Sequence, residues 1–191
     1  MGYFKNPEET AKTIDSEGYL HSGDNGIVTK DGILYITGRK KELIITAGGE
    51  NIPPVLIENE LRAALPFLSS VMVVGDMKKF LTCLVALREE APGSEKLDPS
   101  AASYLADHGV PITKVKEGQG NEKLGKLIME GLKEANKKAI SWAQYVQDFH
   151  LMPEEFSVDN GTLTPTLKLK RKEALKKYNA DIEKMYIKAS L

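Results

Sequence analysis

The sequence of 191 residues has one cysteine, three histidines and a formal net charge of only −1. A single cysteine cannot form a disulfide within the chain and is typical of a reducing compartment. Cys83 lies in an apolar run, where a buried, unreactive thiol is expected. His21, His108 and His150 are far apart in sequence and do not show the spacing of a zinc site. We therefore predict no metal site.

Strong charge and long apolar runs are also missing. A net charge near zero gives no overall field that would recruit nucleic acid. No stretch approaches the roughly 20 apolar residues of a membrane helix, and the first residues lack the apolar segment of a secretory signal. The prediction is a cytoplasmic protein with no nucleic-acid partner and no transmembrane segment, for which peripheral membrane association stays open.

The first 40 residues predict a short helix followed by a β-hairpin. Asn6 is expected to cap the helix, with Pro7 at its first position. Asp31-Gly32 stands between two β-branched runs, which is a hairpin signal. This opening contains few large apolar residues, and an isolated hairpin is marginally stable in water. It is too small to close a core of its own.

The rest of the chain predicts an α+β fold, in which helices pack on a small mixed sheet. Apolar runs of strand length and helical spacing of apolar residues support this prediction. Short strands are expected on both sides of Gly48-Gly49, and longer ones at 71–74, 81–87 and 146–152. Helices are expected at 54–65, 99–107 and 121–142, and a last one contains Leu175, Tyr178, Ile182 and Met185.

Three short motifs have both a structural and a chemical interpretation. Gly48-Gly49 could be only a loop, or a bare backbone that lets a ligand approach closely. Asp24 could form an Asx turn, or accept hydrogen bonds from the two hydroxyls of a ribose. Arg39 could form a weak surface salt bridge, or present its planar donors to ribose or phosphate. Residue chemistry alone favours the structural interpretations.

The order and spacing of four motifs resemble the closing portion of the acyl-adenylate-forming superfamily, which includes acyl-CoA synthetases, luciferases and adenylation domains. These motifs are Gly23-Asp24, Gly38-Arg39, Gly48-Gly49-Glu50-Asn51 and Leu163–Arg171. The residues of the last two motifs are most similar to those of long-chain fatty acyl-CoA synthetases of the bubblegum type. The resemblance implies that residues 1–40 end a large N-terminal, AMP-binding domain, and that residues 41–191 are the C-terminal lid domain.

The resemblance also implies a role for individual residues. Asp24 would bind the ATP ribose, Arg39 would contact the nucleotide, Lys41 would be the hinge, Gly48, Gly49, Glu50 and Asn51 would line the tunnel for the pantetheine arm of CoA, and Lys168 would catalyse adenylation. The family pattern has Ser-Gly before this lysine, whereas this chain has Thr166-Leu167. Lys170 is an alternative to Lys168, and a solvated basic helix start is the structural interpretation of both.

By this resemblance the chain is the C-terminal portion of an ATP-dependent long-chain fatty acid:CoA ligase. Its substrates would be a fatty acid, ATP and CoA, with Mg2+ bound mainly by the missing N-terminal domain. Residues 1–23 contain nothing like the Ser/Thr/Gly-rich phosphate loop of the superfamily, so the chain is expected to be inactive alone. The alternative is a non-catalytic, partner-binding module derived from the lid domain, which an exposed apolar patch would support.

Overall fold

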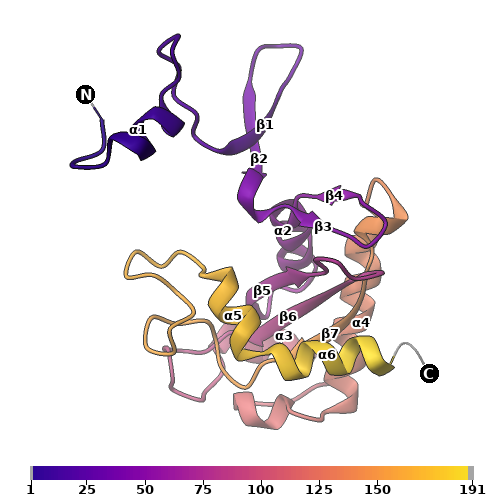
Figure 1. Ribbon diagram of the computed structural model, residues 1–191. Coiled ribbons are helices and arrows are strands. Elements are labelled where there is room, and N and C mark those ends of the chain that lie inside the picture. The colour runs from indigo at the N-terminus through magenta and orange to yellow at the C-terminus, as the bar shows by residue number, and fades with distance from the viewer. Residues whose placement is uncertain (1, 189–191) are drawn as a thin grey trace. The chain divides into compact units, whose positions relative to one another are not determined.

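The computed structural model describes residues 2–188, and the chain divides between Leu43 and Ile44 into two compact units (Figure 1). The first unit contains α1 (Pro7–Thr13), the antiparallel strands β1 (Asp24–Val28) and β2 (Leu34–Arg39), and the 3-10 turn η1 (Lys40–Glu42). The side chain of Asn6 accepts a hydrogen bond from the Glu9 N–H at 3.0 Å, which is the expected cap. The predicted helix and hairpin are confirmed.

The first unit has no buried core. None of its described residues is buried. The large apolar side chains of the hairpin are each more than half exposed: Ile27, Val28, Ile33, Leu34, Tyr35 and Ile36. Since a two-stranded sheet needs packing on at least one face for stability, this hairpin depends on contacts that the first unit does not supply.

The second unit is built on a three-stranded mixed sheet in the order β5–β6–β7. Strands β5 (Leu68–Val74) and β6 (Leu81–Leu87) are antiparallel, and β7 (Val146–Leu151) is parallel to β6. Parallel strands need a long crossover, which here contains α3 (Pro99–Asp107) and α4 (Glu122–Asn136). A two-stranded sheet of β3 (Ile44–Ile45) and β4 (Asn51–Ile52) precedes α2 (Pro54–Ala64). The predicted α+β class is confirmed.

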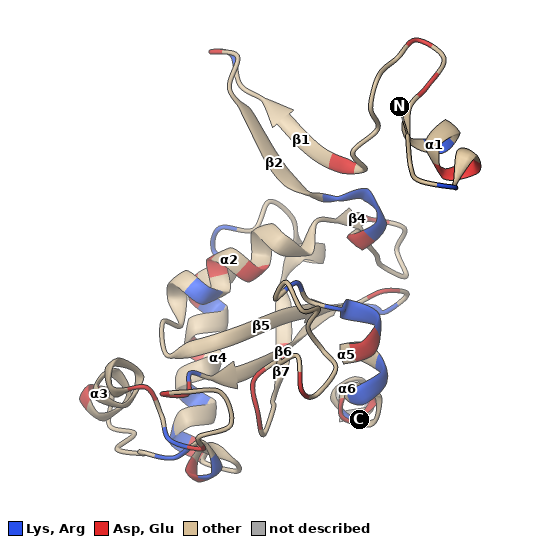
Figure 2. Ribbon diagram, turned by 90° about the vertical axis from the view of Figure 1, so that its left-hand side faces the viewer, with Lys and Arg blue, Asp and Glu red and all other residues tan. Residues whose placement is uncertain are grey.

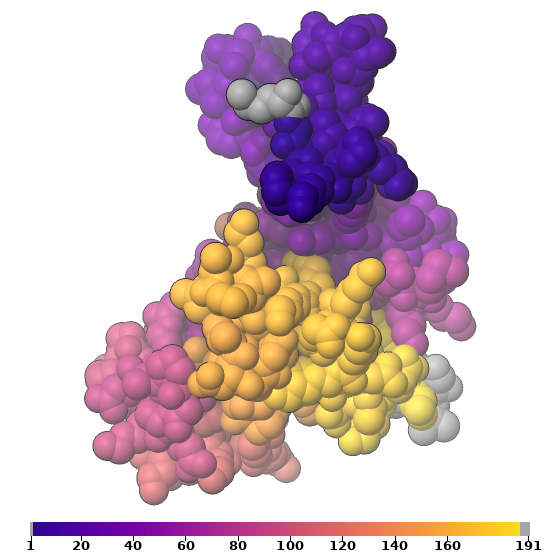
Figure 3. Space-filling model, turned by 60° about the vertical axis from the view of Figure 1, so that its left-hand side comes forward, coloured from indigo at the N-terminus to yellow at the C-terminus, as the bar shows by residue number. Residues whose placement is uncertain are grey.

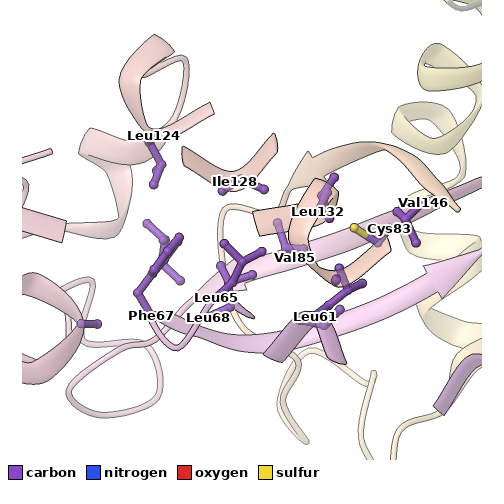
Figure 4. Close-up of a cluster of buried hydrophobic side chains, with 14 of the residues drawn as sticks. Leu61, Leu65, Phe67, Leu68, Cys83, Val85, Leu124, Ile128, Leu132 and Val146 are labelled. Atoms are coloured by element: carbon purple, nitrogen blue, oxygen red, sulfur yellow. The ribbon is translucent and has the colours of Figure 1, made fainter. Parts of the chain in front are cut away.

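Helices cover both faces of this sheet, as Figures 1 and 2 show. Helices α2 and α4 lie on one face, and α5 (Arg171–Lys177) and α6 (Asn179–Lys188) lie on the other. Because side chains alternate along a strand, Val73 and Cys83 enter the larger core while Met72 and Leu84 enter the smaller one. Figure 4 shows the larger core, where leucines of α2 and α4 meet the sheet.

Two helix predictions were wrong in length. The helix predicted over 121–142 ends at Asn136, whose side chain accepts from the Val146 N–H at 3.0 Å and donates to the Val146 carbonyl at 2.9 Å. Ile140 and Trp142 are therefore outside the helix and are 89% and 81% exposed. The predicted last helix is two helices, α5 and α6, that meet at Tyr178. The apolar side chains of both still fill the smaller core.

Two glycines of α4 give a matched test of the packing between α4 and α2. A Cβ added at Gly131, which is buried, would collide with the side chain of Leu65, whereas a Cβ at Gly125 would meet nothing within 4 Å. We expect Gly131→Ala to lower the free energy of unfolding by about 1–3 kcal/mol through overpacking. Gly125→Ala should raise it by about 1 kcal/mol, because alanine is the better helix former. Urea denaturation of both variants measures the two changes, and equal stabilisation by both would contradict the close packing at Gly131.

Candidate active site

Asp24 and Arg39 face each other across the β1–β2 ladder. The Arg39 Nε lies 3.3 Å from the Asp24 Oδ1, and the two side chains are 60% and 26% exposed. Within the described residues, the second carboxylate oxygen and the two terminal guanidinium nitrogens have no partner. An exposed pair of this kind is worth at most about 1 kcal/mol, so a diol or phosphate can compete for either group. The structure thus brings together two residues that were predicted separately.

Lys41 lies exposed in the single turn of η1, two residues before the last residue of the first unit. A few residues at the end of an element can absorb the backbone rotation of a domain movement. This position is compatible with a hinge, and the hinge role of Lys41 stays a prediction.

The turn between β3 and β4 is closed by Thr46, which is buried. Its N–H donates to the Glu50 carbonyl at 3.1 Å, its carbonyl accepts from the Gly49 N–H at 2.9 Å, and its hydroxyl accepts from the Glu50 N–H at 3.2 Å. Gly49 has φ +80°, a conformation that favours glycine. Within the described residues the Gly48 N–H has no partner, and a Cβ at Gly49 would meet nothing within 4 Å. The outer side of the turn is therefore open, bare backbone.

The other two residues of this motif lie at its carboxyl side. Glu50 is exposed, and its Oε2 accepts a hydrogen bond from the Ser141 Oγ at 3.4 Å. Asn51 opens β4 opposite Ile45. The four predicted residues Gly48, Gly49, Glu50 and Asn51 thus form one hairpin tip of the second unit.

Lys168 lies in a tight hairpin in which Leu163 pairs with Leu169. The Leu167 N–H donates to the Thr164 carbonyl at 2.8 Å, the Thr164 N–H donates to the Lys168 carbonyl at 2.8 Å, and the Lys168 N–H donates to the Thr164 Oγ1 at 3.0 Å. Leu167 has φ +60°, so it adopts the left-handed conformation that glycine adopts easily. The turn of this chain therefore forms with leucine at the position where the family pattern has glycine.

The ammonium groups of Lys168 and Lys170 are both free for a ligand. Both side chains are exposed, and neither ammonium has an ion-pair or hydrogen-bond partner in residues 2–188. Figure 3 shows that the orange segment before α5 lies at the surface of the second unit. Residues two apart in an extended chain point to the same side. The local geometry therefore does not decide which of Lys168 and Lys170 is the catalytic lysine.

A substitution at Leu167 tests the strain in this turn. A non-glycine residue in the left-handed region costs roughly 1–2 kcal/mol, while glycine costs about 0.5–1 kcal/mol in lost chain entropy on folding. Leu167 is 71% exposed, so its replacement by glycine forfeits little packing. Leu167→Gly should therefore raise the free energy of unfolding by about 0.5–1 kcal/mol, whereas Leu167→Val, which is β-branched, should lower it. Thermal unfolding of both variants measures this, and a destabilising glycine would contradict the assigned strain.

The sequence prediction missed the ion pair that anchors this segment. The Arg171 Nη2 lies 2.7 Å and 2.8 Å from the two carboxylate oxygens of Glu58, whose side chain is only 4% exposed. The Glu58 Oε1 also accepts from the Val73 N–H at 2.8 Å. One carboxylate therefore joins α2, β5 and the start of α5. The sequence contained an indication of this buried charge, because Glu58 lies three residues before Leu61, on the apolar face of a predicted helix.

Cys83 and Tyr178 are further reactive side chains of the second unit. Cys83 is fully buried, and burial raises the pKa of its thiol well above the usual range, so the thiol stays protonated. Burial also raises the pKa of Tyr178 to about 12. Residues 2–188 contain no cluster of three or more His, Cys, Asp or Glu side chains that could bind a metal ion. None of their helices has the length and apolar character of a membrane span.

This fold, with its glycine turn and its surface lysine segment, is similar to the C-terminal domain of AMP-binding enzymes. Residues 41–107 match the family model described as AMP-binding enzyme C-terminal domain. Over 97% of its length the chain is 42% identical to the long-chain-fatty-acid–CoA ligase ACSBG1 of Mus musculus, and over 100% it is 43% identical to ACSBG2 of Gallus gallus. The chain spans 27% and 26% of these relatives, so it matches about a quarter of their length, at the C-terminal part.

A solved structure agrees with the fold. The adenylation domain of carboxylic acid reductase from Segniliparus rugosus matches 98% of this chain with a TM-score of 0.74 at 20% identity, and the match spans 26% of that protein. The resemblance to adenylate-forming enzymes of the bubblegum type is confirmed. The roles of the individual residues stay predictions.

Proposed function

We propose that this chain is the C-terminal portion of an ATP-dependent long-chain fatty acid:CoA ligase. The observation that carries the proposal is 42% identity to such a ligase over 97% of the chain. In the first half-reaction, a carboxylate oxygen of the fatty acid attacks the α-phosphorus of ATP, which forms acyl-AMP and releases pyrophosphate. In the second, the CoA thiol attacks the acyl carbonyl, which forms the thioester and releases AMP.

Three residues serve the nucleotide in this proposal. The free oxygen of Asp24 accepts from the ribose hydroxyls, and the free nitrogens of Arg39 donate to the same nucleotide. Lys168 brings a mobile positive charge to the α-phosphate, where negative charge gathers as the carboxylate attacks. A charge aimed at the transition state in this way stabilises it more than the ground state. The unpaired ammonium of Lys168 supports this role.

The hairpin tip at Gly48–Asn51 serves the second half-reaction. A turn with bare backbone and an unpaired Gly48 N–H suits a narrow tunnel, because the pantetheine arm is thin and carries amide groups that pair with backbone. Lys168 and this tip act in different half-reactions. The second unit must therefore bring Lys168 to the reactants in the first half-reaction and the tip to them in the second. Lys41 provides the hinge for that change.

In this proposal, the remaining parts of the enzyme correspond to the part of the longer relatives that this chain does not match. The phosphate loop, the acyl pocket and most of the Mg2+ binding belong to the N-terminal domain, of which residues 1–40 are the end. The exposed apolar hairpin of the first unit supports this assignment, because its side chains suit a larger core. Alone, the 191 residues are inactive. The enzyme is cytoplasmic, and peripheral membrane association is compatible with its long-chain substrate.

The same exposed hairpin is the observation that favours the second candidate, a non-catalytic module that binds a partner protein. Contiguous apolar side chains on a surface are typical of interaction sites. The two candidates differ in whether the chain can complete a ligase.

A chimera distinguishes them. This chain would replace the matching C-terminal part of the Mus musculus ligase, and formation of palmitoyl-CoA from palmitate, ATP and CoA would be measured. We expect activity in the chimera and none in the isolated chain. A chimera that folds and binds ATP but forms no palmitoyl-CoA would overturn the ligase proposal and favour the partner-binding module.

A further inference from the structure

The turn between β5 and β6 holds the strand that leads into the glycine tip. The Asp76 Oδ1 accepts from the Ile45 N–H at 3.1 Å, the Met77 N–H donates to the Ile45 carbonyl at 2.8 Å, and the Ala47 N–H donates to the Lys78 carbonyl at 2.9 Å. Three hydrogen bonds from one turn thus fix the backbone at 45–47, although the segments are 31 residues apart in sequence.

This turn is itself firmly held. The Lys78 N–H donates to the Gly75 carbonyl at 3.0 Å, and Met77 has φ +56°. A left-handed methionine persists only where its surroundings fix it. The Lys78 ammonium lies 2.7 Å from the Glu183 Oε1 and 4.7 Å from the centroid of the Tyr186 ring. Side chains of helix α6 therefore also contact the turn.

The glycine tip needs such support. The β3–β4 sheet has only two residue pairs, and glycine has more backbone freedom to lose than any other residue. Thr46 closes the tip from within, but its bonds join residues of the same loop. The bonds to Asp76, Met77 and Lys78 tie the tip to the turn of the main sheet, in addition to the packing of Ile44 and Ile52 in the larger core. Asp76 is the only one of these three that contributes through its side chain, so a single substitution can remove its bond alone.

We propose that Asp76 is a positioning residue for the reaction with CoA. Its carboxylate fixes the Ile45 N–H and, through it, the orientation of the tip at Gly48–Asn51 against the pantetheine arm. Asp76 acts through the backbone and does not touch the substrate. This inference rests on the proposed function for its consequence, while its geometric part stands on the described contacts alone.

Hydrogen exchange of the 191-residue chain tests the geometric part without any activity. In Asp76→Ala, exchange of the Ile45, Ala47 and Gly49 amides should accelerate about tenfold, the change that loss of a hydrogen bond to a charged acceptor produces. Asp76→Asn keeps the acceptor oxygen and should restore the original rates. Asp107→Ala, at an exposed carboxylate at the end of α3, is the matched control and should leave these amides unchanged. Unchanged exchange in Asp76→Ala would overturn the inference whatever the chain catalyses.

Kinetics of the chimera test the consequence. Asp76→Ala should raise the KM for CoA about tenfold, in line with the loss of one charged hydrogen bond, while fatty-acid-dependent ATP–pyrophosphate exchange stays unchanged. Asp76→Asn should restore the KM. Faster amide exchange with an unchanged KM for CoA would show that the turn is only structural and would overturn the positioning role. Failure of the ligase proposal would give a different result from failure of the positioning role, because the unsubstituted chimera would then be inactive.

Discussion

Replacing Lys168 by alanine in the chimera is expected to lower the rate of acyl-AMP formation by about 10²–10³-fold, the usual effect of removing one group that stabilises transition-state charge. The ammonium is exposed, unpaired within residues 2–188 and placed on a fixed hairpin, so it can reach a phosphate without breaking an ion pair. Palmitate-dependent ATP–pyrophosphate exchange measures this half-reaction alone. Thioester formation from supplied palmitoyl-AMP and CoA should stay near the original rate.

Lys170→Ala is the matched control. Lys170 is exposed, carries the same charge and lies two residues further along the chain. Its replacement should leave pyrophosphate exchange nearly unchanged. If Lys170→Ala caused the large loss and Lys168→Ala did not, the catalytic role would move to Lys170. Normal exchange in both variants would leave the two lysines as solvated charges at a helix start.

The elements that the sequence predicted well are those with local causes. The helix predicted over 99–107 is observed at Pro99–Asp107, because proline at its first position and the capping side chain of Asp98 act within one turn. The hairpin around Asp31-Gly32 follows from turn chemistry in the same way. The apolar runs of strand length in β5 and β6 could also be recognised, although not which face each side chain would cover.

The features that escaped prediction depend on contacts between distant segments. Helix α4 ends at Asn136 because that side chain binds Val146 at the start of β7. Leucine has no preference for a left-handed turn, so nothing in the sequence indicated the conformation of Leu167. For the site, the motifs were found by resemblance alone. The structure adds that Asp24 and Arg39 are a cross-strand pair, and that Asp76 supports the glycine tip.

Breaking the ion pair between Glu58 and Arg171 should have the largest effect on stability. We expect Glu58→Ala to lower the free energy of unfolding of the chain by about 3–5 kcal/mol, because it removes the buried carboxylate that pairs with the Arg171 guanidinium. The Val73 N–H would also lose its acceptor. Glu60→Ala is the control in the same helix: Glu60 pairs with Lys138 at the surface, and its loss should cost at most about 1 kcal/mol. Urea denaturation measures both, and similar small losses would contradict the buried pair.

A paired replacement separates stability from positioning. Glu58→Leu combined with Arg171→Met removes both charges and fills the space with apolar atoms, which often restores the stability that a single replacement loses. The Lys168 hairpin would then lack the bidentate anchor three residues downstream, since methionine makes no directed bonds. In the chimera we therefore expect near-normal stability but slower pyrophosphate exchange. Full exchange activity in the stable double variant would mean that the ion pair holds the fold together and has no part in placing Lys168.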